Sequence, residues 1–372
     1  MTWISLITLT AVLVISIQWY TGIRRMPFVR QTEIQKQLPS VTIIAAAKNE
    51  EKRIREAADS FLSLDYPDLE IVIVNDRSTD QTGEILQDVK KNHPAGSRLT
   101  LKTIQNLPEG WLGKNHALYI GAENSVSDWL LFTDGDIIFH PEALKYAASH
   151  AVNNNLDHLP LIPQNEGGTL PYRAFHYYWS IIGIWNFIQL KHAGVGAFNF
   201  LRREAYEAIG THAAVKSAPD DDLKLGKILV KAGYRQQLAF GMGLVFVQWY
   251  ESVPEVINGL EKNLFAFMRY STALVLTFST VIFLLHIFPF AALFAAGFPS
   301  ALIYAFILIV YAAMYFYNRK FAGDSPLFYF TLPLAALLFI YCLLRSAYKA
   351  LRRGGIDWRG TTYSLKELKR KK

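Results

Sequence analysis

Two aspartates separated by one glycine, Asp134 and Asp136, stand directly after an apolar run, LLFT at 130–133. Their like charges repel each other and weaken a strand. A polar turn that ends the strand leaves both carboxylates in solvent. A divalent cation removes the repulsion instead, because Mg²⁺ and similar hard cations take carboxylate oxygens as ligands. The pair alone leaves both interpretations open.

Polar side chains also end two other apolar runs. SVTIIAAA at 40–47 is followed by Asn49 and Glu50, and LEIVIVND at 69–76 ends in Asp76. Short apolar runs of this length, with amphipathic stretches between them, are typical of buried strands that alternate with helices.

The stretch from about 38 to 240 predicts an α/β fold with a mostly parallel sheet. Further elements are expected as a helix at 49–64, a helix at 78–92 capped by Ser78 or Thr79, a strand at 98–106, a helix at 113–125 and a strand at 128–136. Ligands of such sheets bind beyond the carboxyl ends of the strands. We therefore expect the polar ends of three strands to meet at one edge, where they suit a nucleotide diphosphate.

A dinucleotide-dependent dehydrogenase is the competing nucleotide-binding class. Its G-x-G-x-x-G motif directly follows the first strand of the fold. No such motif follows the run at 40–47, and GVGAFNF at 194–200 has only G-x-G and comes far too late in the chain. The dehydrogenase interpretation is therefore discounted.

Long uncharged stretches indicate a membrane protein. Residues 3–19 carry no charge and are followed by basic residues, which indicates an uncleaved anchor within 1–25 and not a signal peptide. No Lys, Arg, Asp or Glu occurs from Ser271 to Tyr317, too long for one crossing, which needs about 20 residues. The candidate spans are residues 3–19, 272–293, 299–317 and 327–344, divided near Pro289 and the segment 295–300.

The basic residues next to these spans give the expected orientation. Arg24, Arg25 and Arg30 place the polar middle of the chain in the cytoplasm, at the cell (inner) membrane. The basic tail at 347–372 also favours the cytoplasm, although four crossings would put it on the other side. Either one segment within 270–346 is re-entrant or interfacial, leaving two or three crossings there, or the charge bias fails.

The net charge of +7 is concentrated beside the spans and at the end of the chain. It is interpreted as attraction to an anionic lipid surface and not to nucleic acid. The single cysteine, Cys342, lies in a candidate span, which excludes an intramolecular disulfide and a thiolate metal site.

Six segments carry a resemblance to a known family: VTIIAAAKNEEKRI, IVIVNDRSTDQT, GWLGKNHAL, LLFTDGD, GVGAFNFLRREAYEAIG and PDDDLKLGKIL. Their order resembles that of family 2 glycosyltransferases with the GT-A fold, over residues 38–268. The layout of anchor, domain and spans is similar to the membrane-bound, lipid-glycosylating branch, which includes the carotenoid-acid (staphyloxanthin-type) and hopanoid-associated glycosyltransferases. The resemblance implies a Rossmann-like catalytic domain with transmembrane helices.

The resemblance also implies roles for particular residues. Asp76 would hold the base of a nucleotide-diphosphate sugar, with Asn49 and Glu50 in the loop above it. Asp134 would orient the ribose and, with Asp136, bind Mg²⁺ or Mn²⁺; Lys114 would lie near the sugar or the diphosphate at a helix start. The residues implied for the donor or its metal are Asn49, Glu50, Asp76, Lys114, Asp134 and Asp136.

The catalytic base is expected in PDDDLKLG at 219–226. The family pattern E-D-x-x-L aligns Asp220 with the base and puts Pro219 in place of the usual Glu, whereas a register one residue later selects Asp221. An inverting transfer needs such a carboxylate to take the proton of the acceptor hydroxyl. Two histidines, His192 and His212, could contact phosphate or the acceptor, but both are interpreted as structural.

We expect an enzyme that transfers a single hexose to a lipid acceptor such as a carotenoid, hopanoid or glycerolipid. The Q/R-x-x-R-W motif of processive synthases is absent, and GLEKNLFAFMRYS occupies its region at 259–271. The aromatic stretch at 172–190 is expected as an interfacial helix at the mouth for the lipid. The alternatives are exopolysaccharide or polyprenyl-phosphate sugar synthesis, and an inactive scaffold that binds nucleotide sugar.

Overall fold

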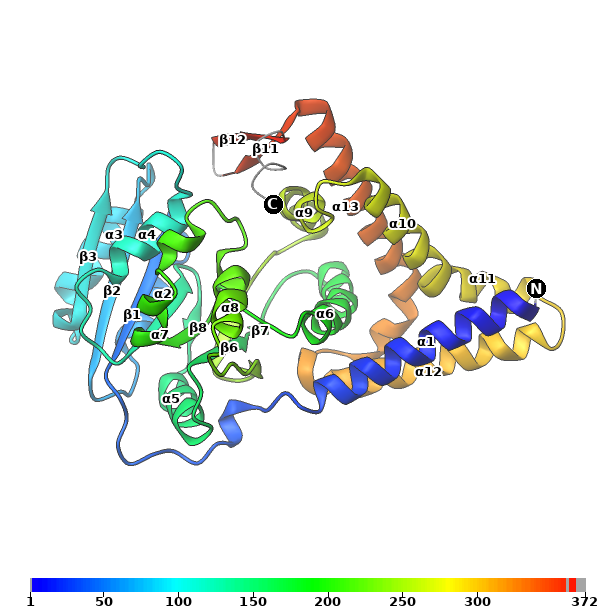
Figure 1. Cartoon of the computed structure of the whole chain (residues 1–372), viewed down its shortest axis with the longest axis horizontal. Coiled ribbons are helices and arrows are strands. Elements are labelled where there is room, and N and C mark those ends of the chain that lie inside the picture. The colour runs from blue at the N-terminus through cyan, green and yellow to red at the C-terminus, as the bar shows by residue number, and fades with distance from the viewer. Residues whose placement is uncertain (1, 359–360, 366–372) are drawn as a thin grey trace. The chain divides into compact units, whose positions relative to one another are not determined.

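The protein divides into two compact units, which are described separately. The computed structural model (Figure 1) describes residues 2–358 and 361–365. The α/β unit comprises Arg24–Glu166 and Phe187–Val247, and the helical unit comprises Met1–Ile23, Gly167–Asn186 and Gln248–Lys372.

A seven-stranded sheet in the order β3-β2-β1-β4-β8-β6-β9 forms the centre of the α/β unit. Its strands are β1 (Val41–Ala47), β2 (Leu69–Asp76), β3 (Leu99–Ile104), β4 (Trp129–Asp134), β6 (His158–Ile162), β8 (Asn199–Arg202) and β9 (Ala239–Phe240). Strands β3, β2, β1 and β4 are parallel, and β8 runs antiparallel between β4 and β6. The predicted mostly parallel sheet is confirmed.

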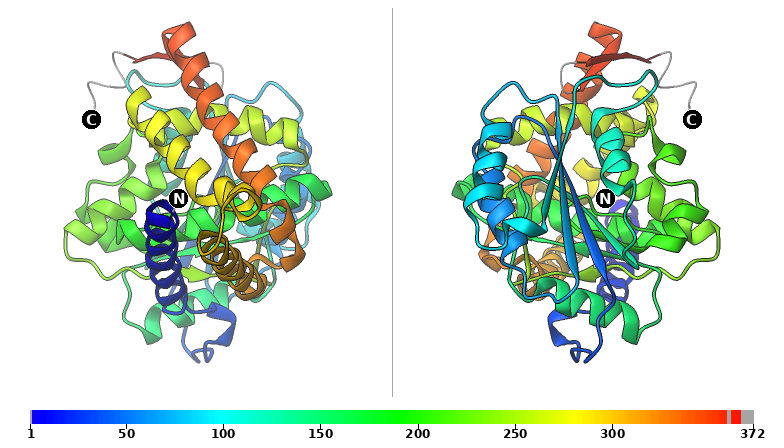
Figure 2. Two further views of the ribbon diagram at one scale, coloured as in Figure 1. Left: turned by 90° about the vertical axis from the view of Figure 1, so that its right-hand side faces the viewer. Right: turned by 90° about the vertical axis from the view of Figure 1, so that its left-hand side faces the viewer.

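Helices cover both faces of this sheet because its central strands are apolar on both sides. All seven residues of β1 are buried. One core joins the sheet to α2 (Ile54–Leu62), α3 (Thr82–Asn92) and α5 (Ala143–Asn153); the other joins it to α4 (Gly113–Ala122), α7 (Arg203–Ala208) and α8 (Asp221–Lys231). The right-hand view of Figure 2 faces the strands and helices of this unit.

Short elements complete the α/β unit. The unit also contains a three-stranded sheet in the order β5-β10-β7. Three 3-10 helices lie in the segments between the longer elements. These elements are β5 (Ile138–Phe139), β7 (Gln164–Asn165), β10 (Val245–Val247), η1 (Val29–Gln31), η2 (Gly96–Arg98) and η3 (His212–Val215).

The predicted cap of the helix after β2 is wrong. Helix α3 begins at Thr82, with Gln81 and not Ser78 or Thr79 at the N-cap. The Ser78 hydroxyl instead accepts a hydrogen bond from the backbone N–H of Asn49, at 3.1 Å. The residues between β2 and α3 therefore bind the loop after β1 and do not start a helix.

The helical unit contains the uncharged stretches of the sequence. Its elements are α1 (Thr2–Ile23), α6 (Leu170–Leu190, whose last turn belongs to the α/β unit), α9 (Val253–Phe267), α10 (Thr272–Ile282), the π-helical turn η4 (Phe283–Ile287), α11 (Phe288–Ala295), α12 (Ser300–Ala322), η5 (Pro326–Thr331), α13 (Leu332–Arg353), β11 (Gly355–Trp358) and β12 (Thr361–Ser364). Strands β11 and β12 form an antiparallel hairpin.

Four helical stretches in the described part of the chain are long and apolar enough to cross a membrane. They are Thr2–Ile23, Thr272–Ala295, Ser300–Ala322 and Pro326–Arg353. Each contains one of the four stretches predicted from the sequence or overlaps it almost completely. Pro289 does not end a helix, because it lies in the first turn of α11 after the π-helical turn; the break falls at 296–299.

The aromatic stretch predicted as a helix is α6. One of its faces packs within the helical unit, where the Tyr177 hydroxyl donates to the Tyr315 carbonyl at 2.5 Å and Arg173 pairs with Asp324. Its position at a membrane interface stays a prediction. The last part of the predicted tail, 366–372, lies outside the described residues.

Candidate active site

The carboxyl ends of β1, β2 and β4 lie next to one another at one edge of the sheet. β1 is the middle strand of the three, and its residue Ala46 is in register with Val74 of β2 and Asp134 of β4. Asp76 and Asp134 are the last residues of their strands. The polar residues that follow these strands therefore emerge at the same edge, as the sequence predicted.

The loops after β1 and β2 are locked together at this edge. Asn49 Oδ1 accepts a hydrogen bond from the Thr79 backbone at 2.8 Å, and the Glu50 backbone N–H donates to the Thr82 hydroxyl at 2.8 Å. Asn49 has a positive φ of 56°, a left-handed conformation that Asn tolerates better than most residues. The structure thus holds Asn49 and Glu50 above the end of β2, where the sequence placed them.

Asp76 is buried against the start of α4. The Arg77 guanidinium donates to both of its oxygens, at 2.7 and 3.1 Å. A Cβ at Gly113, the first residue of α4, would stand 2.2 Å from Asp76 Oδ2, so only glycine fits there. Asp76 is therefore fixed at the beginning of the helix that carries Lys114.

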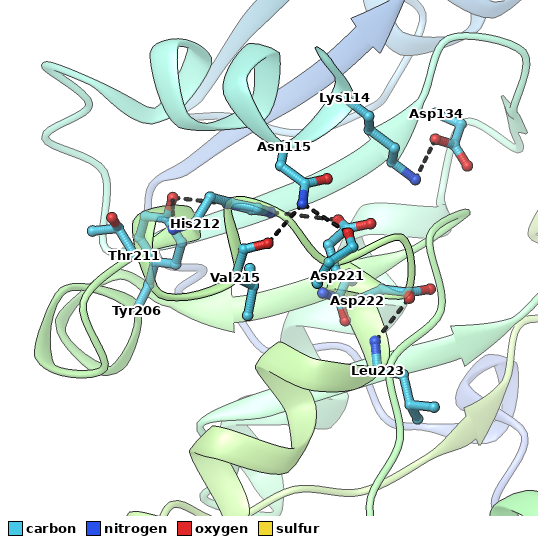
Figure 3. A network of polar contacts seen from close by, with 12 residues as sticks. Lys114, Asn115, Asp134, Tyr206, Thr211, His212, Val215, Asp221, Asp222 and Leu223 are labelled. Atoms are coloured by element: carbon cyan, nitrogen blue, oxygen red, sulfur yellow. Dashed lines mark hydrogen bonds and ion pairs between the residues drawn. The ribbon is translucent and has the colours of Figure 1, made fainter. Parts of the chain in front are cut away.

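Lys114 and Asp134 form an ion pair of 2.7 Å (Figure 3). Burial alone would lower the pKa of the lysine, but the negative charges of Asp134, Asp221 and Asp222 outweigh it and hold that pKa above its usual value. Lys114 is therefore a permanent cation among carboxylates that come from β4 and α8.

The surroundings of Asp136 disfavour the charged form of its side chain. Burial, and then the adjacent carboxylate of Asp134, raise its pKa to about 6, while Lys114 and Arg53 oppose this rise. A bound cation would stabilise the charged form of a carboxyl whose pKa is raised beside a second carboxylate. This charge balance agrees with the cation interpretation of the D-G-D sequence.

The three acids at the start of α8 have three different environments. Asp220 occupies the N-cap and pairs with Lys224 at 3.3 Å, with both side chains about two-fifths exposed. Asp221 is buried and lies 3.7 Å from the ring of His212. Asp222 accepts a hydrogen bond from the Leu223 backbone and lies near Lys114 and Asp134.

Gly196 marks the point where these side chains converge. A Cβ at this position would stand 3.0 Å from Lys114 Nζ, 3.1 Å from Asp134 Oδ2 and 3.5 Å from Asp222 Oδ2. The missing side chain leaves room among the three groups. The carboxylate of Asp222, and not that of Asp220, thus faces the Lys114–Asp134 pair.

The pKa of Asp222 is raised to about 6. Burial is the largest cause, followed by the charge of Asp221, and Lys114 opposes the rise. The pKa of Asp221 is lowered instead, because Lys114 and His212 together outweigh the effect of its burial. The pKa values of these two adjacent acids are therefore shifted in opposite directions. Enzymes commonly give two neighbouring acids different roles by shifting their pKa values apart.

Close backbone contacts hold α8 in place. A Cβ at Gly194 would stand 2.0 Å from the Asp222 carbonyl oxygen, and one at Gly226 would stand 1.8 Å from that of Ala193. On the other side, Asn115 donates to two carbonyls just before α8, those of Val215 and Ala218, both at 2.8 Å. The helix that carries Lys114 and the helix that carries the acids are thereby joined.

Sequence reasoning missed Asp222. The signal was nevertheless present, because E-D-x-x-L also fits Asp221 through Leu225, with Asp221 in place of Glu and Asp222 in the position of the base. The registers that select Asp220 or Asp221 leave the residue next to Lys114 out. His192 Nδ1 lies 2.7 Å from the carbonyl oxygen of Leu190.

No group of three or more His, Cys, Asp or Glu side chains forms a preassembled metal site within residues 2–358 and 361–365. Mg²⁺ is typically bound through one or two carboxylates together with substrate phosphates. Asp134 and Asp136 provide two such carboxylates, and burial together with the charge of Asp134 raises the pKa of Asp136. The donor set fits the cation that the sequence implied.

Comparisons with known proteins agree on the class of enzyme. Residues 42–210 match the family described as Glycosyl transferase family 2. The chain is 22% identical to 4,4'-diaponeurosporenoate glycosyltransferase of Staphylococcus aureus over 355 residues, which are 88% of each protein. It is 31% identical to poly-beta-1,6-N-acetyl-D-glucosamine synthase of Staphylococcus epidermidis over 140 residues, only 32% of that synthase.

A solved structure shares the fold. The mannosyltransferase PcManGT from Pyrobaculum calidifontis, in complex with GDP-Man and Mn²⁺, superposes with a TM-score of 0.60 at 18% identity, over 94% of this chain and 98% of that one. The fold is of the GT-A type. The predicted fold class is confirmed.

Proposed function

We propose that this chain, which belongs to glycosyl transferase family 2, transfers a single hexose from a nucleotide-diphosphate sugar to a lipid acceptor with inversion at the anomeric carbon. The observation that carries the proposal is the convergence of Lys114, Asp134 and Asp222 around Gly196 at the carboxyl edge of the sheet. A cation, a metal-binding carboxylate and a carboxylate with a raised pKa are the groups that such a transfer needs.

The donor is assigned to the end of β2 and the start of α4. Asp76 holds the base, with Asn49 and Glu50 closing the loop above it, and Lys114 meets the diphosphate. The backbone N–H groups at the start of a helix favour such an anion. Asp134 and Asp136 hold Mg²⁺ or Mn²⁺, which would neutralise the charge that collects on the departing nucleoside diphosphate. The neighbour bound to GDP-Man and Mn²⁺ supports a metal of this kind.

Asp222 is the proposed base. Its carboxylate takes the proton of the acceptor hydroxyl while that oxygen attacks the anomeric carbon and the bond to the diphosphate oxygen breaks. A pKa of about 6 keeps Asp222 ionised at neutral pH and makes it a stronger base than an ordinary aspartate. Asp220 is assigned no part in this step, because its carboxylate pairs with Lys224.

A lipid acceptor is supported by the chain outside the catalytic unit. The similarity to the carotenoid-acid enzyme extends over 88% of both proteins, whereas the similarity to the polysaccharide synthase covers 35% of this chain. Four stretches are suited to crossing a membrane. We assign the protein to the cell membrane as a multi-pass enzyme, with its α/β unit in the cytoplasm on the side of Arg24, Arg25 and Arg30.

The test is transfer by the purified full chain in detergent, with Mn²⁺, a panel of UDP- and GDP-linked hexoses and a lipid extract of the host. Mass spectrometry should find a lipid that has gained one hexose, with UDP-linked donors most active. Release of nucleoside diphosphate without a glycolipid would contradict a lipid acceptor. Products with several sugars would support the polysaccharide alternative.

A further inference from the structure

The site contains two adjacent buried carboxyls, and only one is needed as a base. Asp221 and Asp222 both approach Lys114, and they follow each other in the first turn of α8. If Asp221 could turn toward the acceptor, the two would compete for its proton. If the proposed function holds, some part of the fold must therefore keep Asp221 away from the acceptor.

His212 is the neighbour of Asp221 on the side away from the proposed substrates. It is the first residue of η3 and is completely buried. The edge of its ring packs against Phe132 of β4, with ring centroids 4.5 Å apart. A polar ring in such a place needs partners, because an unpaired buried polar group is costly.

The Tyr206 hydroxyl is the partner of one ring nitrogen of His212. Its oxygen accepts the backbone N–H of His212 at 3.0 Å and lies 2.8 Å from His212 Nδ1. Because this oxygen already accepts one N–H, the arrangement favours donation of the hydroxyl proton to Nδ1. A neutral His212, which its lowered pKa favours, therefore carries its own proton on Nε2.

This Nε2–H faces Asp221. The distance from Nε2 to Asp221 Oδ2 is 3.7 Å, longer than a hydrogen bond, and Nε2 has no hydrogen-bond partner among the described residues. The titratable groups around Asp221 are Lys114 from α4, Asp222 from its own helix and His212 from η3. His212 is thus the side-chain N–H that faces this carboxylate from the protein interior, in addition to the backbone N–H of Asp221 itself.

We propose that His212 is a positioning residue for the transfer reaction: its Nε2–H, fixed by the Tyr206 hydroxyl, holds the Asp221 carboxylate in the protein interior, so that Asp222 alone meets the acceptor. His212 acts through Asp221 and touches neither donor nor acceptor. The chain Tyr206–His212–Asp221 (Figure 3) thereby decides which of two adjacent acids is the base.

The experiment compares two substitutions of similar size. His212→Phe fills the same space without a donor, and His212→Gln retains an N–H near the position of Nε2. With the lipid acceptor varied and Mn²⁺ and donor saturating, His212→Phe should lower kcat by about 10- to 100-fold, because losing a polar contact to a charged group costs about that much. With the donor varied instead and the acceptor saturating, KM for the donor should stay near that of the wild type, and His212→Gln should recover most of kcat.

A matched control is His93→Phe, at the C-terminal end of α3, which should leave kcat unchanged. Should His212→Phe fail to fold, Tyr206→Phe carries the test, because it frees the ring to place its proton on Nδ1 and should lower kcat without raising KM for the donor. Wild-type kcat in His212→Phe, or equal losses in the Phe and Gln variants, would overturn the positioning role while leaving the proposed function intact. An inactive wild type with every donor would overturn both.

Discussion

Two clusters of charged residues in this protein carry excess charge of opposite sign, one negative and one positive. At the edge of the sheet, the acidic cluster of Asp134, Asp136, Asp221 and Asp222 lies around Lys114, and Arg53 also acts on Asp136. In the helical unit, the basic cluster of Arg345, Lys349 and Arg353 from α13 surrounds the single carboxylate of Glu261 on α9, at 3.3, 2.6 and 3.6 Å.

The clusters differ in how the excess charge is accommodated. The acidic cluster is largely buried, and burial together with the charge of a neighbouring aspartate raises the pKa of Asp136 and that of Asp222 to about 6. The basic side chains are between a quarter and a half exposed, so water or an anionic lipid surface can solvate them. An uncompensated charge that is buried therefore indicates a missing ligand, whereas an exposed one does not.

The largest effect is expected when the proposed catalytic base of the acidic cluster, Asp222, is replaced. Asp222→Asn should lower kcat by about 10²- to 10⁴-fold, because a general base contributes about that much. Its melting temperature in detergent at pH 7.5 should not fall. The reason is that the folded state raises the pKa of Asp222 above 3.8, so the wild type bears the cost of the charge above pH 6, and the variant does not.

The control for that variant is Asp220→Asn. Its carboxylate pairs with Lys224, one turn further along α8, so kcat should stay within about twofold of the wild type. A larger loss in Asp220→Asn than in Asp222→Asn would show that the sequence register through Asp220 is the correct one.

The next effect concerns Lys114, the cation that the acidic cluster shares. Lys114→Met keeps most of the side-chain volume and removes the charge, and it should lower kcat/KM by about 10²-fold, since one lost electrostatic contact to the developing charge costs about that much. Initial rates at varied donor concentration measure this loss. Unchanged kcat/KM would mean that Lys114 only neutralises Asp134.

The dependence on pH follows from the proposed base. Asp222 works only when it is deprotonated, and its pKa is about 6 and not 3.8. The value of kcat/KM should therefore be constant above about pH 7 and fall about tenfold per unit below pH 6. A profile that stays flat down to pH 4.5 would contradict the raised pKa.

The smallest effect concerns the basic cluster. Glu261→Gln removes the one carboxylate that three exposed cations share, and it should lower the free energy of unfolding by only about 1 kcal/mol. Thermal unfolding in detergent measures this loss, and the rate of hexose transfer should not change. A loss of transfer comparable to that of Lys114→Met would show that the basic cluster also contributes to the reaction.

Most of the fold could be predicted because its signals are local. Hydrophobic runs such as 41–47 and 69–76 mark buried parallel strands, and uncharged stretches of more than twenty residues mark the candidate spans. The start of α3 was missed because Ser78 bonds a residue of another loop, Asn49, and nothing near Ser78 in the sequence indicates that.

The site could be predicted only in part for the same reason. Asp76, Asp134 and Asp136 follow strands, so the parallel sheet brings them to one edge. The choice among Asp220, Asp221 and Asp222 depends on how α8 is rotated about its axis. The close contacts of Gly194 and Gly226 between α8 and the segment around Ala193 set that rotation. No local sequence pattern predicts that these two segments touch.

The most direct test of the central claim is equilibrium binding of UDP to the purified full chain, with and without Mn²⁺, for the wild type and for Asp136→Ala. If the carboxylates of the acidic cluster hold the donor through a shared cation, Mn²⁺ should strengthen binding to the wild type by at least about tenfold and leave binding to Asp136→Ala unchanged. UDP affinity that is the same in both proteins, and indifferent to Mn²⁺, would contradict the account.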